Sequence, residues 1–459
     1  MISALMRPIQ RAIAAAATLT GKRFGLLVAS SLVATSAIVA SAATNPSGSG
    51  PLAALLGRSL AADNTPAAVA PAPEPSPAPA VTPTHSSAGA TTEVEEAPAV
   101  SSEPAIAPET VEPETETPET PATPEETTPE AGQVKHVFVI SLASPGYEAA
   151  FGAAAQMPYL ATTLRPQGEL LSGYTLLGSA GLPNAIAAVS GQPPNASTQA
   201  NCSTYSEFSG ATLNKKGVVS GSGCVYPVEA LTLADRLALG RFSWHAYMEG
   251  MVDPTTGKPD NCVRPEAESV DQPALGGYAA RQNPFVYFHS LLDLGDCATN
   301  DMPLTQLSTD LRKATATPNY SYIAPNLCNA GVAGQCPAGA PTGAAAADAF
   351  LAQWVPKITA SPAYKEDGLL IVTFDEASRD VTACCNEPTG PNVKAPGRYG
   401  PGGGRIGAVL LSPVIKPGTV IDAPINHYGF LRSVEDIFGL PHLGYAADPA
   451  LNTFVPATP

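Results

Sequence analysis

The chain has 459 residues and a formal net charge of −16. Its composition divides it into three unlike parts, residues 1–43, 44–133 and 134–455. The middle part has 14 acidic residues and one basic residue, Arg58. The first part has four basic residues and no acidic one. The third part therefore has a net charge of about −7. This negative balance argues against a nucleic acid as partner, because binding a phosphate backbone requires an excess of Lys and Arg.

An uncharged apolar segment at residues 24–43 follows the basic residues of the first part. It reads FGLLVASSLVATSAIVASAA and ends in Ala40-Ser41-Ala42, which is typical of a signal-peptidase site. We therefore predict that residues 1–43 are an export signal. Since a run of about 20 apolar residues is just long enough to span a bilayer, the alternative is an uncleaved anchor that tethers the protein to a membrane.

The second part, residues 44–133, is rich in Pro, Ala, Thr and Glu and has almost no large apolar side chain. Such a segment cannot bury enough surface to offset its loss of conformational entropy. We predict a disordered stalk, kept extended by its prolines, that serves as a spacer in the cell envelope.

All eight cysteines lie in the third part, at positions 202, 224, 262, 297, 328, 336, 384 and 385. An even number of cysteines downstream of an export signal predicts disulfides formed in an oxidising compartment. Proximity in the sequence favours the pairs Cys202–Cys224, Cys262–Cys297 and Cys328–Cys336. Cys384 and Cys385 could bond to each other or to other cysteines.

Strand-like runs alternate with helical patterns along residues 134–455. Buried strands are predicted over 134–142, 368–377 and 405–415, with a further strand-like run over 170–177. Helices are predicted over 185–189, 231–240, 304–315 and 344–361. The alternation predicts one α/β domain with a mostly parallel central sheet flanked by helices, disulfide-bonded and placed behind the stalk, with its site at the carboxyl ends of the strands.

Two features stand at such strand ends. Asp375 and Glu376 follow the strand at 368–374, and His427 precedes an amphipathic helix; two carboxylates and a histidine from another loop are the layout of a hydrolytic metal site. The alternative for the acidic pair is a helix cap or a solvated turn. The segment GSAGLPNAIAAVSGQPPN (178–195) is the second feature. It predicts a strand, tight turn and helix, the arrangement that presents a nucleophile in many hydrolases, but the tip of the turn is Gly181, which has no side chain.

The third part resembles the bacterial phosphoesterase family of acid phosphatases and phospholipases C, within the alkaline phosphatase superfamily. The resemblance rests on landmarks in the family order across nearly all of 134–455. They read HVFVISL…YEAAFG, GLPNAIAAVSGQPPN, TLADRLALGRFSWHAYMEGM, YAARQNPFVYFHSLLD, PNYSYIAPNLCNAG, GLLIVTFDEA, GPGGGRIGAVLLSPVIKPGT and NHYGFLRSVEDIFGLPHLGYA. The resemblance implies an alkaline-phosphatase-like fold in which a hydroxyl nucleophile attacks phosphorus beside a divalent metal.

The residues that should carry this chemistry are replaced. Gly181 stands at the nucleophile position, and Ser179 is a hydroxyl two residues out of register. Ala143 and Ser144 stand where the family has metal-binding Glu and Asn. In the later loop, Ala330 and Val332 are among the residues that replace its carboxylates and imidazole.

The matching polar residues that remain are Asp375, Glu376, His427, Asn184 and Glu249. The first three are candidate remnants of the metal site, and Asn184 and Glu249 are candidate binding residues.

The family landmarks are retained, whereas the polar groups of the active site are replaced. This pattern predicts an exported pseudoenzyme that binds a ligand or acts as a scaffold and needs no cofactor. Its partner would be an unidentified ligand or protein of the cell envelope, and backbone N–H groups at the Gly181 turn could hold an anion. The alternative is an active hydrolase in which Asp375, Glu376 and His427 hold a divalent metal, assisted by Ser179 or Ser144. A purely mechanical role of the stalk is a third hypothesis.

Overall fold

The computed structural model describes residues 134–377, 380–397 and 399–454. The chain divides into two units, Met1–Glu116 and Thr117–Pro459, and every described residue belongs to the second. The predicted export signal or anchor and the predicted stalk lie outside the described residues. Among the residues that are described, no helix combines the length and the apolar composition needed to cross a membrane.

An eight-stranded sheet forms the centre of the folded unit, in the order β12-β2-β11-β9-β1-β8-β6-β7. All strands run parallel except β11, which is antiparallel to both of its neighbours. The bounds are β1 His136–Leu142, β2 Glu169–Leu171, β6 Trp244–Met248, β7 Asp301–Pro303, β8 Tyr320–Ala324, β9 Gly368–Phe374, β11 Ala408–Leu411 and β12 Thr419–Ile421. Because β1, β8 and β9 are buried on both faces, they consist almost entirely of apolar and aromatic residues; β1 and β9 were predicted as strands, and β8 was not.

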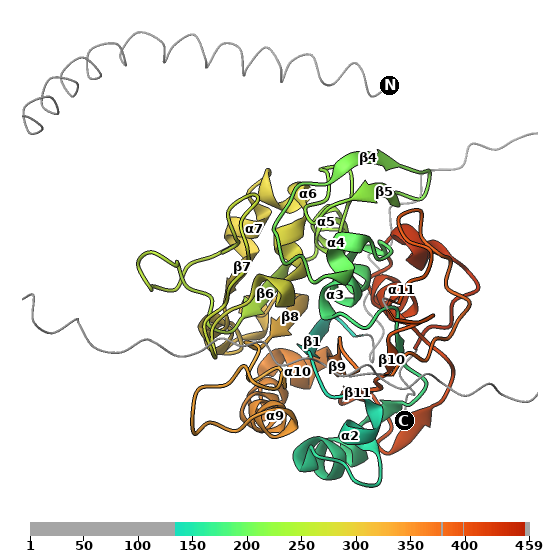
Figure 1. Cartoon of the computed structure of the whole chain (residues 1–459). Coiled ribbons are helices and arrows are strands. Elements are labelled where there is room, and N and C mark those ends of the chain that lie inside the picture. Colours follow the sequence, from blue (N-terminus) through green and yellow to red (C-terminus); the bar gives the residue numbers. More distant parts are fainter. Residues whose placement is uncertain (1–133, 378–379, 398, 455–459) are drawn as a thin grey trace, which may run out of the picture. The chain divides into compact units, whose positions relative to one another are not determined.

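Helices cover both faces of this sheet. Figure 1 shows α3 and α11 on one side of the strands and α9 and α10 on the other. The helices are α2 Tyr147–Phe151, α3 Gly181–Ser190, α4 Ala196–Gln199, α5 Leu233–Leu239, α6 His289–Leu292, α7 Asp296–Asn300, α8 Leu307–Asp310, α9 Ala344–Thr359, α10 Pro362–Asp367 and α11 His427–Ile437. The predicted α/β class, with a mostly parallel sheet between helices, is confirmed.

Three predicted elements differ in extent. The run 170–177 is two strands, β2 and β3 (Thr175–Leu176), because the chain at Gly173 passes so close to the backbone of Asp422 and Ala423 that a Cβ there would lie 2.4 Å from a carbonyl oxygen. β3 pairs instead with β10 (Gly404–Arg405) in a separate ribbon. The strand predicted over 405–415 is shortened to β11, and the helix over 304–315 contracts to a 3-10 turn and α8.

A hairpin outside the main sheet completes the fold. Its strands are β4 (Ser209–Leu213) and β5 (Val219–Ser222), which pair antiparallel. Gln192, just beyond α3, fixes the hairpin: its Nε2 donates to the Gly217 carbonyl oxygen at 2.7 Å and its Oε1 accepts from the Val219 N–H at 2.9 Å. The hairpin tip is therefore held against the domain.

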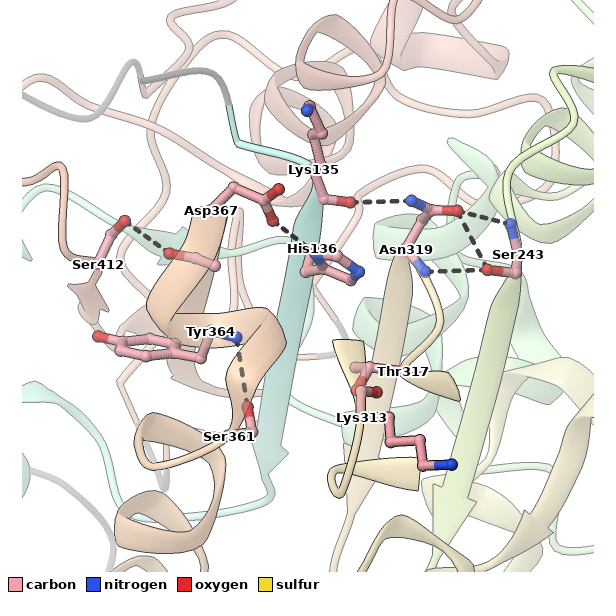
Figure 2. A network of polar contacts seen from close by, with 11 residues as sticks. Lys135, His136, Ser243, Lys313, Thr317, Asn319, Ser361, Tyr364, Asp367 and Ser412 are labelled. Atoms are coloured by element: carbon pink, nitrogen blue, oxygen red, sulfur yellow. Dashed lines mark hydrogen bonds and ion pairs between the residues drawn. The ribbon is translucent and has the colours of Figure 1, made fainter. Parts of the chain in front are cut away.

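Polar side chains tie the strands together at the amino edge of the sheet (Figure 2). Asn319 donates from Nδ2 to the Lys135 carbonyl oxygen at 3.1 Å and accepts from both the N–H and the Oγ of Ser243. His136 and Asp367 pair their side chains across the starts of β1 and β9. Polar side chains at the amino edge of the sheet therefore bond to other parts of the fold. The carboxyl edge is the edge that remains for a functional site.

Four disulfides join all eight cysteines. The pairs Cys202–Cys224, Cys262–Cys297 and Cys328–Cys336 confirm the predicted connectivity, and the remaining cysteines, Cys384 and Cys385, are bonded to each other. Disulfides of this number fit a protein of an extracytoplasmic compartment.

Asp301, at the start of the edge strand β7, is a fully buried carboxyl group. Its Oδ2 accepts a hydrogen bond from Asn283 Nδ2 at 2.8 Å, and its Oδ1 has no partner. Burial raises the pKa of Asp301 to about 7, although the Asn283 bond acts in the opposite direction. A carboxyl group whose pKa is raised by folding stabilises the fold at low pH and loses that contribution as pH rises through the folded pKa.

We therefore expect the contribution of Asp301 to the unfolding free energy to fall by up to about 4 kcal/mol between about pH 4 and pH 8. The variant Asp301→Asn keeps the acceptor for Asn283 but carries no titrating group, so its stability should vary less over this range. Urea unfolding of both proteins at several pH values measures the difference. Identical pH profiles would contradict the assignment.

Candidate functional site

The carboxyl ends of the central strands bring the predicted site segments to one edge of the sheet. Ala143 follows β1, Glu249 follows β6, and Asp375 follows β9. The segments are bonded to one another: the Asp375 N–H donates to the Leu142 carbonyl oxygen at 2.8 Å, and the Glu249 N–H donates to the Ala324 carbonyl oxygen at 3.0 Å. This is the position at which α/β folds of this kind place their sites.

The turn that should carry a nucleophile meets Asp375 and Glu376 at this edge. Helix α3 begins at Gly181, and a Cβ added at this residue would lie 2.9 Å from Asp375 Oδ1 and 3.1 Å from Glu376 Oε1. Carbon atoms do not approach side chains this closely without displacement. A Cβ at position 181 would therefore require the Asp375 and Glu376 carboxyl groups to shift, because these groups lie directly beside the glycine.

The backbone donors at the start of α3 are already used within the protein. The Gly181 N–H donates to the Glu376 carboxylate, and the Leu182 N–H donates to Asn201 Oδ1 at 3.0 Å. Pro183 has no N–H to offer. The first three positions of the helix thus hold no free donor, which is against the expectation that this turn binds an anion through its backbone.

Asp375 is a fully buried and Glu376 a half-buried residue, and their carboxyl groups lie beside the amino end of α3. Burial raises the pKa of both side chains, and the neighbouring Glu376 raises the pKa of Asp375 further. The positive charge of Arg281 acts in the opposite direction on both pKa values, and Asp375 Oδ1 has no hydrogen-bond partner. Arg281 lies in a 3-10 turn, Ala280–Gln282, that packs against α3.

Asn184 links the turn to the acidic pair. Its Oδ1 accepts from the N–H groups of Leu177 and Gly178, and its Nδ2 donates to the carbonyl oxygens of Gly178, Ala180 and Asp375 at 2.7–2.9 Å. The side chain is fully buried. Every polar atom of Asn184 is used in holding the loop, and a role in ligand binding stays a prediction.

Ser179, the out-of-register hydroxyl, lies in the same turn. Its Oγ is buried and has no hydrogen-bond partner among the described residues. No histidine or carboxylate bonds to it there, so the base that activates a serine nucleophile in hydrolases is not placed beside it.

Three positions that the resemblance assigns to metal ligands come together in space. The N–H groups of Ala143 and Ser144 both donate to the Ala330 carbonyl oxygen at 3.0 Å. Ala143 and Ala330 are fully buried, and Val332 is bonded through its N–H to the Leu327 carbonyl oxygen. The predicted juxtaposition of the two loops is therefore present, but methyl groups and backbone fill it.

Glu249 occupies the neighbouring loop. Its carboxylate accepts from the Asn326 N–H at 3.1 Å and from Asn329 Nδ2 at 2.9 and 3.0 Å. Burial raises the pKa of Glu249, and both asparagine contacts act against that rise. Glu249 orders the loop that follows β8, and its predicted binding role is not tested by this arrangement.

His427 lies at the first position of α11, where Asn426 caps the helix by accepting from the N–H groups of Tyr428 and Gly429. The imidazole is 2% exposed, packs against Tyr174 and has no partner at Nδ1. Burial lowers the pKa of His427 to about 3, so the ring is neutral at pH 7. Its environment is an aromatic one.

The described residues do not fit the divalent ion that the resemblance implies. Two groups of three potential ligand atoms lie within 4.8 Å of one another in this part of the chain, Cys262–Cys297–Asp301 and Cys384–Cys385–Glu387. The cysteines of both groups are in disulfides, so neither offers a thiolate. Asp375 and Glu376 form no such group with His427, which leaves two carboxyl groups where a metal needs at least three ligands.

Two residues of this arrangement were missed in the sequence. Asn201 caps α3 from a position 19 residues beyond Leu182, and nothing in the local sequence marks it. Arg281 lies within the landmark YAARQNPF. A basic side chain in this mostly apolar run could have been recognised from the sequence as a candidate site residue.

The contact at Gly181 predicts a coupling between two substitutions. Gly181→Ala should lower the unfolding free energy by about 1–3 kcal/mol, because its Cβ collides with Asp375 Oδ1. The Asp375→Ala variant lacks the carboxyl group that this Cβ meets. In that variant, Gly181→Ala should lower the unfolding free energy by at least about 1 kcal/mol less than it does in the unaltered protein. A double-mutant cycle in urea measures this coupling, and additive free energies would contradict the contact.

Solved structures resemble this chain at low identity. They include a protein of the alkaline phosphatase superfamily from Vibrio parahaemolyticus (13% identity, 69% of this chain and 71% of that one, TM-score 0.39). Another is the lipoteichoic acid synthase LtaP from Listeria monocytogenes (11% identity, 71% of this chain and 78% of that one, TM-score 0.37).

A curated relative, a probable acid phosphatase from Kluyveromyces lactis, is 24% identical over 319 residues, which make up 69% of this chain and 61% of the relative. The chain thus spans about three-fifths of the length of that protein. The model of the Phosphoesterase family matches residues 162–441, which include α3, β9 and α11. The chain belongs to the Phosphoesterase family.

Proposed function

We propose that this chain is a phosphoesterase-family pseudoenzyme that binds or scaffolds and does not hydrolyse phosphate esters. The observation that carries the proposal is the contact of Asp375 and Glu376 with Gly181. A side chain at that position would collide with both carboxyl groups, and the backbone N–H of Gly181 is occupied by Glu376.

The loss of metal ligands supports the same proposal. The loops after β1 and β8 meet through Ala143, Ser144 and Ala330, which offer no carboxylate or imidazole. Without a bound metal, neither a hydroxyl nor a water molecule has its pKa lowered enough to attack phosphorus rapidly. Losing the nucleophile by itself removes several powers of ten in rate in hydrolases of known mechanism.

The alternative function is a metal-dependent phosphoric ester hydrolase with a rearranged site around Asp375, Glu376 and His427. Its support is the likeness to a probable acid phosphatase and the survival of the acidic pair. It would require His427 to leave its aromatic packing against Tyr174 and approach Asp375.

We further propose that the protein is exported and acts in the cell envelope on an unidentified ligand or protein, without a nucleic acid partner. The four disulfides and the signal-like residues 1–43 support this, and residues 24–43 would serve as a tether if they are not removed. The Pro-rich segment 44–133 would then hold the folded unit away from the membrane.

The proposal predicts that the protein neither binds a divalent metal ion nor hydrolyses phosphate esters. The full chain, purified with its disulfides intact, is incubated with Mn²⁺, Ca²⁺ or Zn²⁺, and metal content is measured together with hydrolysis of p-nitrophenyl phosphate and bis-p-nitrophenyl phosphate. We expect less than stoichiometric metal and a rate equal to that of the matched Asp375→Ala variant. A stoichiometric metal and a rate abolished by Asp375→Ala would establish the alternative.

Restoring the hydroxyl should not restore the activity. Gly181→Ser places Cβ against Asp375 and supplies no metal ligand, so we expect its rate to stay at the level of Gly181→Ala. The matched alanine variant separates a chemical effect of the hydroxyl from a change in folding. Metal-dependent hydrolysis by Gly181→Ser alone would show that a metal centre survives.

A further inference from the structure

A cavity of about 470 Å³ lies at the far end of α3 from Gly181. Ser190, the last residue of the helix, lines it, so about 15 Å of helix separates the cavity from the acidic pair. The other lining residues that matter here are Lys215, Lys216, Arg236, Glu229 and His442. A volume of this size suits a small molecule.

The two lysines reach the cavity from a turn of fixed shape. They form the tip between β4 and β5, where Asn214 Oδ1 accepts from the N–H groups of Lys216 and Val218 at 2.8 and 3.1 Å. Gln192 holds the same tip to the domain. The backbone from which both lysine side chains extend is therefore held in place before any ligand binds.

Arg236, in the last turn of α5, contributes a third cation from the domain side. Its Nε is buried and has no hydrogen-bond partner, which is costly for a charged group. Within the described part of the chain, none of Lys215, Lys216 and Arg236 forms an ion pair. Three positive charges thus line one cavity without a bound carboxylate.

The acidic groups near the cavity do not cancel these charges. Glu229 is the one carboxylate on the lining, and Asp436 is bonded to His442 at 2.7 Å. Glu435 lies behind Leu443, whose N–H donates to it, and burial raises the pKa of Glu435 to about 8 although Arg236 acts to lower it. At pH 7 Glu435 is therefore mostly uncharged.

We infer that this cavity binds a phosphate monoester of sugar size, with its phosphate held by Arg236, Lys215 and Lys216. The two terminal nitrogens of an arginine can donate to two oxygens of a tetrahedral oxyanion, and the lysines supply further positive charge. The site lies apart from the acidic pair, so it stands whether or not phosphate esters are hydrolysed at Gly181.

The test is calorimetric titration of the full chain with glucose 6-phosphate, inorganic phosphate and glucose. We expect glucose 6-phosphate to bind more tightly than phosphate and glucose not to bind. Arg236→Gln and the double variant Lys215→Gln/Lys216→Gln should each raise Kd for glucose 6-phosphate at least tenfold. The lysines are exposed on a hairpin tip, so the double variant keeps the test valid if Arg236→Gln fails to fold.

Two controls separate this site from other anion binding. Lys365→Gln removes an exposed lysine of α10, and Asp375→Ala alters the family site; both should leave Kd unchanged. An affinity that falls equally in Lys365→Gln would mean unspecific charge attraction and would overturn the inference. Absence of binding by the unaltered chain, or binding of free phosphate as tight as that of the ester, would also overturn the sugar-phosphate assignment.

Discussion

The contact between the carboxyl groups of Asp375 and Glu376 and the amino end of α3 determines what the carboxyl edge of the sheet is able to do. A helix begins with backbone N–H groups that have no partner inside the helix, and in many α/β proteins these bind an anion. Here the protein supplies the anion itself, through Glu376 at Gly181, while Asn201 satisfies the next donor. Arg281 partly offsets the acidic charge, and Asn184 fastens the turn to the backbone of Asp375. The arrangement joins the loop after β9 to the start of α3 and occupies the first two backbone donors of that helix.

This closed site depends on a sheet whose two edges differ. At the amino edge, side chains such as Asn319 and Asp367 bond neighbouring strands to each other (Figure 2). At the carboxyl edge, the loops after β1 and β8 meet through backbone hydrogen bonds between Ala143, Ser144 and Ala330. Small residues at these positions allow that close approach. The fold is thus retained at positions where the resemblance would place metal ligands.

Part of this arrangement is present in the sequence, since strands buried on both faces are apolar runs, and β1 and β9 were predicted on that ground. β8 was not predicted, because its five residues form too short an apolar run to be distinguished from a buried helix segment. The disulfide pairs followed from proximity along the chain, and the resemblance placed Gly181 and Asp375 at one site. The sequence did not show that Glu376 caps α3, because that bond joins residues far apart in the chain and depends on loop geometry. For the same reason Asn201 and Arg281 were missed, and His427, which follows a helix cap, turned out to be packed among aromatic rings.

The central position of β1 has a mechanical consequence. β1 begins at His136, directly after the part of the chain predicted to be a stalk, and it is hydrogen-bonded to β8 on one side and to β9 on the other. A pulling force that arrives along the backbone at residue 134 therefore enters the sheet at its middle strand. It loads two parallel ladders in shear, so many hydrogen bonds have to break together. A strand at the edge of the sheet, such as β12, would be peeled away one bond at a time. The predicted stalk would thus join the folded unit at a strand that is hydrogen-bonded on both sides.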